Sequence, residues 1–177
     1  MNKIIATALG LAAFTAAYGQ GTVLVQNNLG AAITYILQPD GTRATGADYK
    51  VEVFTYSGNA ANPFGTQLGA TVTIAANGRF TAGSQAVPGV AGGATAQLIV
   101  RAWDTKTGAD YASALISGKS DVFTSSVLGG AGNPPSTPSS MVTGLPTGFQ
   151  SFALTPEPTT IALGALGAAA LFIRRRK

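Results

Sequence analysis

Few side chains in this 177-residue sequence could carry out chemistry. It contains no cysteine and no histidine, which excludes the Ser-His-Asp and Cys-His arrangements, the common zinc sites and the usual general base near neutral pH. Residues 20–154 include scattered carboxylates, but none are paired at a spacing suited to hydrolysis. A glycine-rich run at 129–132 lacks the strand–turn–helix context of a phosphate-binding loop. We therefore expect a protein that is not an enzyme and that uses no cofactor.

One turn places two carboxylates close together in sequence, between Asp104 and Asp110. Oxygen atoms of Asp104, Thr105 and Asp110 could bind calcium. Lys106 and Gly108, however, occupy alternate positions at which a calcium loop needs oxygen ligands, and no closing Glu follows. The preferred interpretation is a polar hairpin turn with a solvated Lys106, so no metal site is predicted.

Aromatic side chains offer a second candidate site, because sugar rings stack on flat aromatic surfaces. A platform of this kind could consist of Trp103, Tyr111, Tyr49 and Tyr56. The alternation of its segment places Trp103 on the same face as Arg101, which suits a sugar-binding surface. The preferred interpretation, however, is that the single tryptophan of a small sandwich is a core or edge residue whose indole N–H has a hydrogen-bond partner.

The most specific motif lies at the C-terminus, where a polar segment, an apolar run and a cationic cluster follow one another. In the polar segment, Pro156 and Pro158 flank Glu157, and the two proline rings fix the backbone around the carboxylate. The uncharged run that follows predicts a membrane helix at 159–173. Basic residues at the end of a span resist translocation and stay on the cytoplasmic side. The stop-transfer cluster consists of Arg174, Arg175, Arg176 and Lys177.

This order of features resembles the PEP-CTERM sorting signal of exported bacterial proteins. Thr155 precedes the motif and Thr159 follows it, where the commonest form of the signal has Val and Ser. The resemblance implies that a membrane protease-transpeptidase, exosortase, recognises Pro156, Glu157 and Pro158 and releases or transfers the protein. It also implies export across the inner membrane and a transient hold in the membrane by residues 155–177. Delivery to the cell envelope, the cell surface or the extracellular space would follow.

A plain C-terminal membrane anchor is the alternative. As a helix, the 159–173 run would span about 22 Å, which is shorter than a hydrocarbon core of about 30 Å. A short helix suits a temporary hold better than a permanent one. We therefore favour the sorting signal.

The N-terminus predicts a secretory signal peptide over residues 1–19. Lys3 supplies the positive charge, and an apolar segment follows from residue 4 to 17. Small residues precede the expected cleavage site, which lies between Gly19 and Gln20. Both ends of the chain are therefore targeting segments, and residues 20–154 form the expected domain.

Composition and turn spacing predict that this domain is an all-β antiparallel sandwich. Its acidic and basic residues balance, so the pI of about 9.6 arises from the chain ends, and no nucleic-acid partner is expected. About seven to nine short strands, separated by turns every 8–12 residues or so, are typical of an immunoglobulin-like sandwich. Alternation is clearest at 49–56 and 94–104. The mixed second face of the 94–104 strand suggests partial exposure.

Turn-forming residues divide the remainder of the domain. The Asn-Gly pair at 77–78 predicts a tight hairpin turn, and the Pro-Gly pair at 88–89 together with the Gly-Gly pair at 92–93 predicts the next connection between strands. A run rich in Gly, Pro and Ser predicts a long surface loop at 128–144, and alternation at 149–154 predicts a last strand. The rhythm of these strands and turns resembles transthyretin-like and Cna-B-like surface modules.

Together these features predict a non-enzymatic exported protein that is sorted through its C-terminus to the cell envelope or extracellular matrix. Its low-charge β-domain would have a structural or adhesive role. The alternative is a carbohydrate-binding module for exopolysaccharide, and a hydrolase is less favoured because His and Cys are absent. The expected partners are an exosortase-type membrane enzyme, the membrane itself and, under the alternative, exopolysaccharide.

Overall fold

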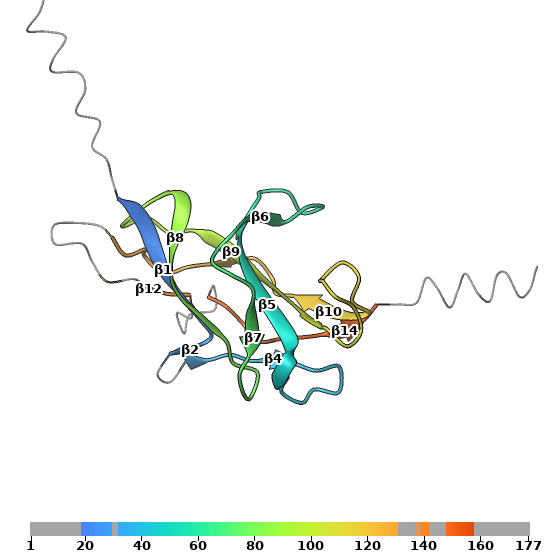
Figure 1. Cartoon of the computed structure of the whole chain (residues 1–177). Coiled ribbons are helices and arrows are strands. Elements are labelled where there is room, and N and C mark those ends of the chain that lie inside the picture. The colour runs from blue at the N-terminus through green and yellow to red at the C-terminus, as the bar shows by residue number, and fades with distance from the viewer. Residues whose placement is uncertain (1–18, 30–31, 131–136, 138, 142–147, 158–177) are drawn as a thin grey trace, which may run out of the picture.

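The computed structural model describes residues 19–29, 32–130, 137, 139–141 and 148–157 (Figure 1), and all their regular elements are β-strands. The strands are β1 (Gln20–Gln26), β2 (Asn28–Leu29), β3 (Ala32–Ile33), β4 (Ile36–Leu37), β5 (Gly46–Tyr56), β6 (Phe64–Gln67), β7 (Val72–Ile74), β8 (Thr81–Ala91), β9 (Gln97–Asp104), β10 (Ile116–Lys119), β11 (Phe123–Thr124), β12 (Ser139–Ser140), β13 (Phe152–Ala153) and β14 (Thr155–Pro156). The all-β prediction is confirmed.

The larger sheet has seven strands and is built around the β5–β9 pair. Its strand order is β14-β10-β9-β5-β6, with β7 also paired to β5 and β11 to β9. The β5–β9 register runs without a break from Tyr49 opposite Asp104 to Thr55 opposite Leu98. Every pairing in this sheet is antiparallel.

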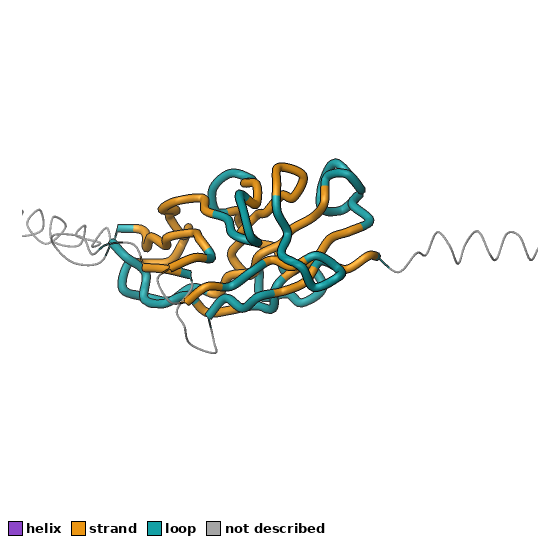
Figure 2. The backbone as a smooth tube through the Cα atoms, turned by 90° about the horizontal axis from the view of Figure 1, so that it is seen from below, coloured by secondary structure: helices purple, strands orange, loops and turns teal. Residues whose placement is uncertain are grey.

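A smaller sheet, of order β12-β1-β8, shares one hydrophobic core with the larger sheet. Val23 and Val25 of β1 contribute to this core, as do Val51 of β5 and Val100 of β9, and all four are fully buried. Two sheets that enclose a common core are compatible with the expected sandwich. The tube view shows that the described chain ends lie at opposite ends of the molecule (Figure 2).

Two local predictions are confirmed by backbone geometry. Asn77 and Gly78 both have positive φ, at 52° and 71°, as the turn of a tight hairpin requires. The predicted inner face of the 94–104 strand is buried, and Ala96, Leu98 and Ala102 all lie in the core. In both places the sequence signal lies within a few neighbouring residues, which is why it could be recognised without the fold.

Three expectations need correction. The Pro-Gly pair at 88–89 does not connect two strands but lies within β8, where the register with β1 shifts and Gly89 has a φ of 74°. Because β8 is an edge strand, Pro88 deprives no neighbour of a hydrogen bond, and the irregularity accommodates it.

The second correction is that the fold is not wholly antiparallel. β12 pairs with β1 and β13 with β4 in parallel, after long connections along the chain.

The third correction concerns surfaces that were expected to be exposed. The predicted loop at 128–144 begins with buried Leu128, contains β12 and includes buried Met141, so parts of it belong to the structure of the domain. The second face of β9 is also covered, because Ile99 is 1% and Trp103 is 4% exposed. Phe64 of β6 and Tyr111 from the connection between β9 and β10 pack over this face.

The targeting segments lie largely outside the described residues. These include the signal peptide up to residue 18, the predicted helix at 159–173 and the basic cluster at 174–177. Within the part of the chain that the structure describes, no helix has the length and apolarity needed to cross a membrane.

Candidate functional site

The first part of the C-terminal motif is the edge strand of the larger sheet. β14 lies antiparallel to β10, with Thr155 opposite Ser117 and Pro156 opposite Ile116. The Glu157 amide donates a hydrogen bond of 2.8 Å to the carbonyl oxygen of Leu115. The paired backbone therefore continues three residues beyond residue 154, where the domain was expected to end.

Pro156 lies at a position in this strand where its missing N–H removes no hydrogen bond to β10. Because Glu157 is hydrogen-bonded to Leu115, the adjacent Pro156–Ile116 pair is of the non-hydrogen-bonded kind. The nitrogen of Pro156 therefore faces the open edge of the sheet, where proline is tolerated. An edge without a donor at this point also resists the addition of another strand.

Leu154 anchors this edge strand from its N-terminal side. Its side chain is fully buried, and its amide donates a 2.8 Å hydrogen bond to the Leu37 carbonyl oxygen. Thr155, Pro156 and Glu157 by contrast are exposed. The chain thus passes from the core to the molecular surface within a single peptide unit.

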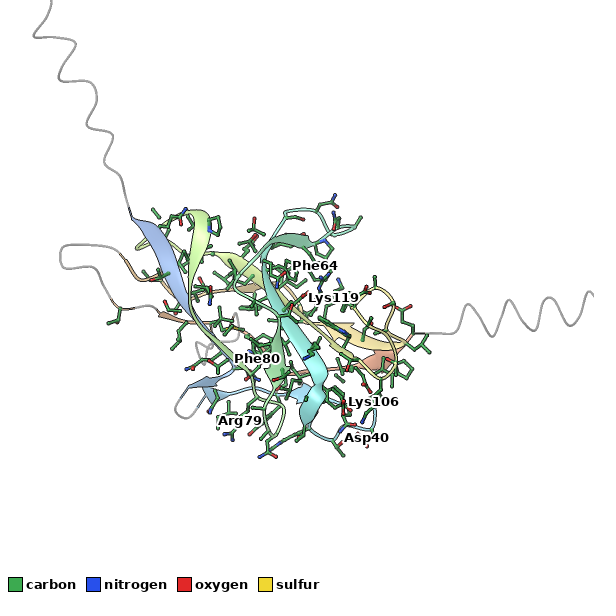
Figure 3. All side chains as sticks on the ribbon, in the orientation of Figure 1. Asp40, Phe64, Arg79, Phe80, Lys106 and Lys119 are labelled. Atoms are coloured by element: carbon green, nitrogen blue, oxygen red, sulfur yellow. The ribbon has the colours of Figure 1, made fainter. Side chains whose placement is uncertain are left out.

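Glu157 borders a surface hollow on the outer face of the larger sheet. The hollow is lined by Tyr111, Ser117, Gly118, Lys119, Ala153, Thr155 and Glu157. Burial raises the pKa of Tyr111, the Arg101 guanidinium opposes the shift, and the Glu157 carboxylate adds to it. Lys119 is exposed on the same face, and its side chain is labelled in Figure 3. The motif thus presents its carboxylate beside a tyrosine and a lysine that come from the domain.

The four aromatic residues of the candidate sugar platform do not come together. Trp103 and Tyr111 are in edge-to-face contact with ring centroids 6.4 Å apart, but Tyr49 packs against the core on the opposite side of β5. No contact joins Tyr56 to Trp103 or Tyr111 among the described aromatic pairs. Trp103 is only 4% exposed, and its indole N–H has no hydrogen-bond partner within the described structure, contrary to the satisfied N–H that we expected.

An arginine-centred cluster, which sequence reasoning missed, covers the outer face of β5 and β9. Arg101 forms a 2.7 Å ion pair with Glu52, whose other carboxylate oxygen accepts a 2.6 Å hydrogen bond from Thr71. The guanidinium carbon lies 4.5 Å from the ring centroid of Phe54 and 4.9 Å from that of Phe64. Such stacking stabilises a desolvated cation. Tyr111 adds a third ring at 5.0 Å.

The sequence pattern indicated only some of the residues of this cluster. Glu52 and Phe54 alternate with the inward-facing residues of β5, as Arg101 and Trp103 do in β9. Local sequence cannot give the register that sets Glu52 opposite Arg101. It also cannot show that Phe64 comes from a separate strand to cover them.

In the loop from Asp104 to Asp110, the two carboxylates accept hydrogen bonds from backbone amides that lie close by in the chain. The Asp110 carboxylate accepts hydrogen bonds from the amides of Ala112 and Ser113 and from the Ser113 hydroxyl, and these bonds lower its pKa. Asp104 accepts one from the Lys106 amide. Lys106 is exposed and forms a 2.8 Å ion pair with Asp48, so it is not simply solvated. No group of three or more potential metal-binding side chains gathers among the residues described.

The remaining candidate residues have simple structural positions. Gln20 opens β1 opposite Ala91, and the Gly19 carbonyl oxygen accepts a 3.1 Å hydrogen bond from the Gly92 amide. Within the run at 129–132, Gly129 bridges to Thr22, while residues 131 and 132 lie outside the described structure. Pro158 and the four basic residues at 174–177 also lie outside it.

Comparison with known families shows what the C-terminal segment is. The family model described as the PEP-CTERM protein-sorting motif matches residues 154–177. Comparisons with curated proteins and with solved structures gave no match. The family match begins at the buried Leu154 and includes the whole of β14. The chain therefore carries a PEP-CTERM sorting signal at its C-terminus, and this signal begins inside the folded β-domain.

Proposed function

We propose that this chain is a non-enzymatic exported protein that exosortase processes at its C-terminus and delivers to the cell envelope or extracellular matrix. One observation carries the proposal most directly. The motif matched at 154–177 begins at a core residue and reaches the surface with Glu157 exposed. A sorting enzyme that acts on this segment would therefore act at the surface of a folded cargo.

The cargo itself supports a structural or adhesive role. Apolar side chains cover one face of its larger sheet and the Arg101 cluster covers the other, so side chains pack against the strands on both faces. The ion pair within the cluster is partly desolvated, with side-chain exposures of 25% for Arg101 and 10% for Glu52. Side chains that already contact one another in this way build a rigid module.

Exopolysaccharide binding is the less favoured alternative. A stacking platform needs an exposed aromatic face, whereas Trp103 is 4% exposed. Tyr111 already contacts Trp103, Phe64 and Arg101. Binding of a polysaccharide would therefore have to use side chains other than those of the candidate platform, and a glycan array with the mature protein tests for it.

The test is processing in matched hosts that carry or lack an exosortase. Intact mass of the protein from membranes, surface and medium reports both chain ends at once. We expect wild-type protein to begin at Gln20 in both hosts and to lose Lys177 only where the enzyme is present. Replacing Pro156, Glu157 and Pro158 with Ala should leave export intact and trap full-length protein in the membrane.

A matched control carries the same chemical changes elsewhere. Pro39 and Asp40 are an exposed Pro-acid pair in the turn that follows β4, outside the matched segment at 154–177, so Pro39→Ala with Asp40→Ala should be processed like the wild type. If the wild-type protein keeps Lys177 and stays in the membrane in both hosts, the tail is a plain anchor and the proposal is wrong.

A further inference from the structure

We propose that the edge of β10 is a binding site for the sorting motif, and that the processing enzyme competes with β10 for it. In the folded protein the segment from Thr155 to Glu157 occupies this site as strand β14. The segment must leave β10 before the enzyme can act. This inference rests on the proposed function, and it adds a docked state of the motif that precedes processing.

The backbone of the motif is committed to the domain along one edge. Thr155 and Pro156 pair with Ser117 and Ile116, and the Glu157 amide donates to the Leu115 carbonyl oxygen. An extended peptide that binds in this way leaves only its other edge free. The hydrogen-bonding groups on the β10 side are unavailable to a second protein.

The free edge of β14 is a poor binding surface for an enzyme that pairs with extended backbone. The register turns the nitrogen of Pro156 toward that edge, and proline has no N–H to donate. Recognition of an extended substrate relies on main-chain hydrogen bonds for affinity. While the motif stays docked, its nearest amide donor, that of Glu157, is bound to Leu115. Undocking exposes this donor.

The side chains around β14 suit an acidic extended segment. Thr155 and Glu157 line the surface hollow together with Tyr111 and Lys119 of the domain. Lys119 is exposed and forms no ion pair with Glu157 or with any other described residue. A cation that lines the same hollow as Glu157 favours the docked position of that carboxylate through longer-range attraction rather than direct contact.

The anchor at Leu154 limits how far the segment can open. Its side chain is fully buried and its amide is bonded to the Leu37 carbonyl oxygen, so opening can stop there while the core stays intact. Local opening of a terminal strand requires far less than global unfolding. Undocking would therefore release the motif and leave the rest of the domain folded.

A reversible disulfide between the two strands tests the inference. The chain has no cysteine of its own, so Ser117→Cys with Thr155→Cys introduces a single possible bridge. The two residues are directly opposite in an antiparallel pair, for which a Cα separation of about 5.5 Å is typical and suits a disulfide. Neither substitution changes Pro156, Glu157 or Pro158.

The full-length variant is embedded in membranes with an exosortase, and loss of Lys177 is followed by mass with and without reductant. We expect oxidation to slow processing by about ten-fold or more, and reduction of the same sample to restore it, because the rate follows the undocked fraction. Processing of the oxidised protein within about two-fold of the reduced protein overturns the inference. The two single-cysteine variants control for each substitution.

A second variant shifts the docking equilibrium in the opposite direction. Lys119→Glu places a carboxylate at the hollow that Glu157 borders, so it should weaken docking and accelerate processing. Lys106 lies outside the hollow, so Lys106→Glu should change neither docking nor processing. Slower processing of Lys119→Glu would show instead that the enzyme recognises the docked surface. Wild-type protein that is never processed contradicts the proposed function itself, so the two failures are distinguishable.

Discussion

The amide nitrogen of Glu157 lies 2.8 Å from the carbonyl oxygen of Leu115, so the acidic residue of the sorting motif is bonded to the domain that the motif delivers. A sorting tail joined by a free linker would place no such contact between cargo and signal. Here the signal and the cargo share a strand pair, and changes in either one affect the other.

The shared strand pair predicts a stability difference between two fragments. A fragment of residues 20–157 retains β14, whereas a fragment of residues 20–154 loses it and uncovers the edge of β10. We expect the longer fragment to be more stable by about 1–3 kcal/mol, because a few backbone hydrogen bonds and their packing are lost in the shorter one. Urea denaturation followed by circular dichroism measures the difference, and equal midpoints would show that β14 contributes nothing.

The docked carboxylate predicts a titration shift at Tyr111. Burial raises the pKa of this tyrosine above its ordinary value of 10.0, and Glu157 adds to the shift. Glu157→Gln should therefore lower the pKa, while burial keeps it above the ordinary value. NMR titration of the tyrosine ring measures the shift, and an unchanged pKa would mean that Glu157 lies away from the ring. Asp121→Asn is the control, because Asp121 is not among the groups that shift the pKa of Tyr111.

The sign of the linked stability follows from the same shift. A raised pKa in the folded state means that the folded protein holds its phenol proton more tightly than the unfolded chain does. The associated stability is fully present below pH 10.0, the ordinary value, and is lost as the pH rises from there through the folded-state pKa. Glu157→Gln should reduce this loss.

The two ion pairs of the described structure predict different mutational costs. Arg101→Met removes the partner of a Glu52 carboxylate that is 10% exposed, and it should destabilise the domain by about 2–3 kcal/mol. Lys106→Met breaks an exposed pair with Asp48 and should leave stability unchanged within error. Replacing Glu52 with Gln in the Arg101→Met background should recover part of the loss. Equal effects of Arg101→Met and Lys106→Met in denaturant titrations would contradict this account.

Local chemistry explains which parts of the fold were predictable from sequence. The alternation of β9 separates residues that face the core from those that do not, and the Asn77-Gly78 pair supplies two positive φ angles. Both signals lie within a few neighbouring residues. The Pro-Gly pair in β8 misled because its effect depends on whether the strand has one neighbour or two, which is a property of the sheet.

The site was only partly predictable, because its contacts are distant in sequence. The tail was identified from residue order alone, but nothing in that order shows that Thr155 pairs with Ser117. The prolines that suggested a stiff spacer are equally compatible with an edge strand. Likewise, buried Asn27 joins the hairpin turn through hydrogen bonds to Gly78 and Phe80, which its sequence neighbours do not reveal.

We predict that the membrane segment expected at 159–173 holds one end of the domain at the membrane before processing, because this segment follows β14 closely in the chain. Only Pro158 separates Glu157 from the 159–173 segment, and the Glu157 amide is bonded to Leu115. Two residues span at most about 7 Å in any conformation, so the Leu115 side chain, which is 49% exposed, should lie at the lipid headgroups. Val127 is 57% exposed on another connection and is a matched control.

Single-cysteine variants of this cysteine-free chain make that geometry measurable. Leu115→Cys and Val127→Cys are each labelled with an environment-sensitive fluorophore in the full-length protein, which is then reconstituted in vesicles with quencher-bearing lipids. We expect strong quenching from position 115 and little from position 127, because Leu115 is bonded to the residue at which the chain leaves the domain. Processing by exosortase should abolish the difference by releasing the domain. Equal quenching at the two positions before processing would mean that the domain is not held with β14 toward the membrane.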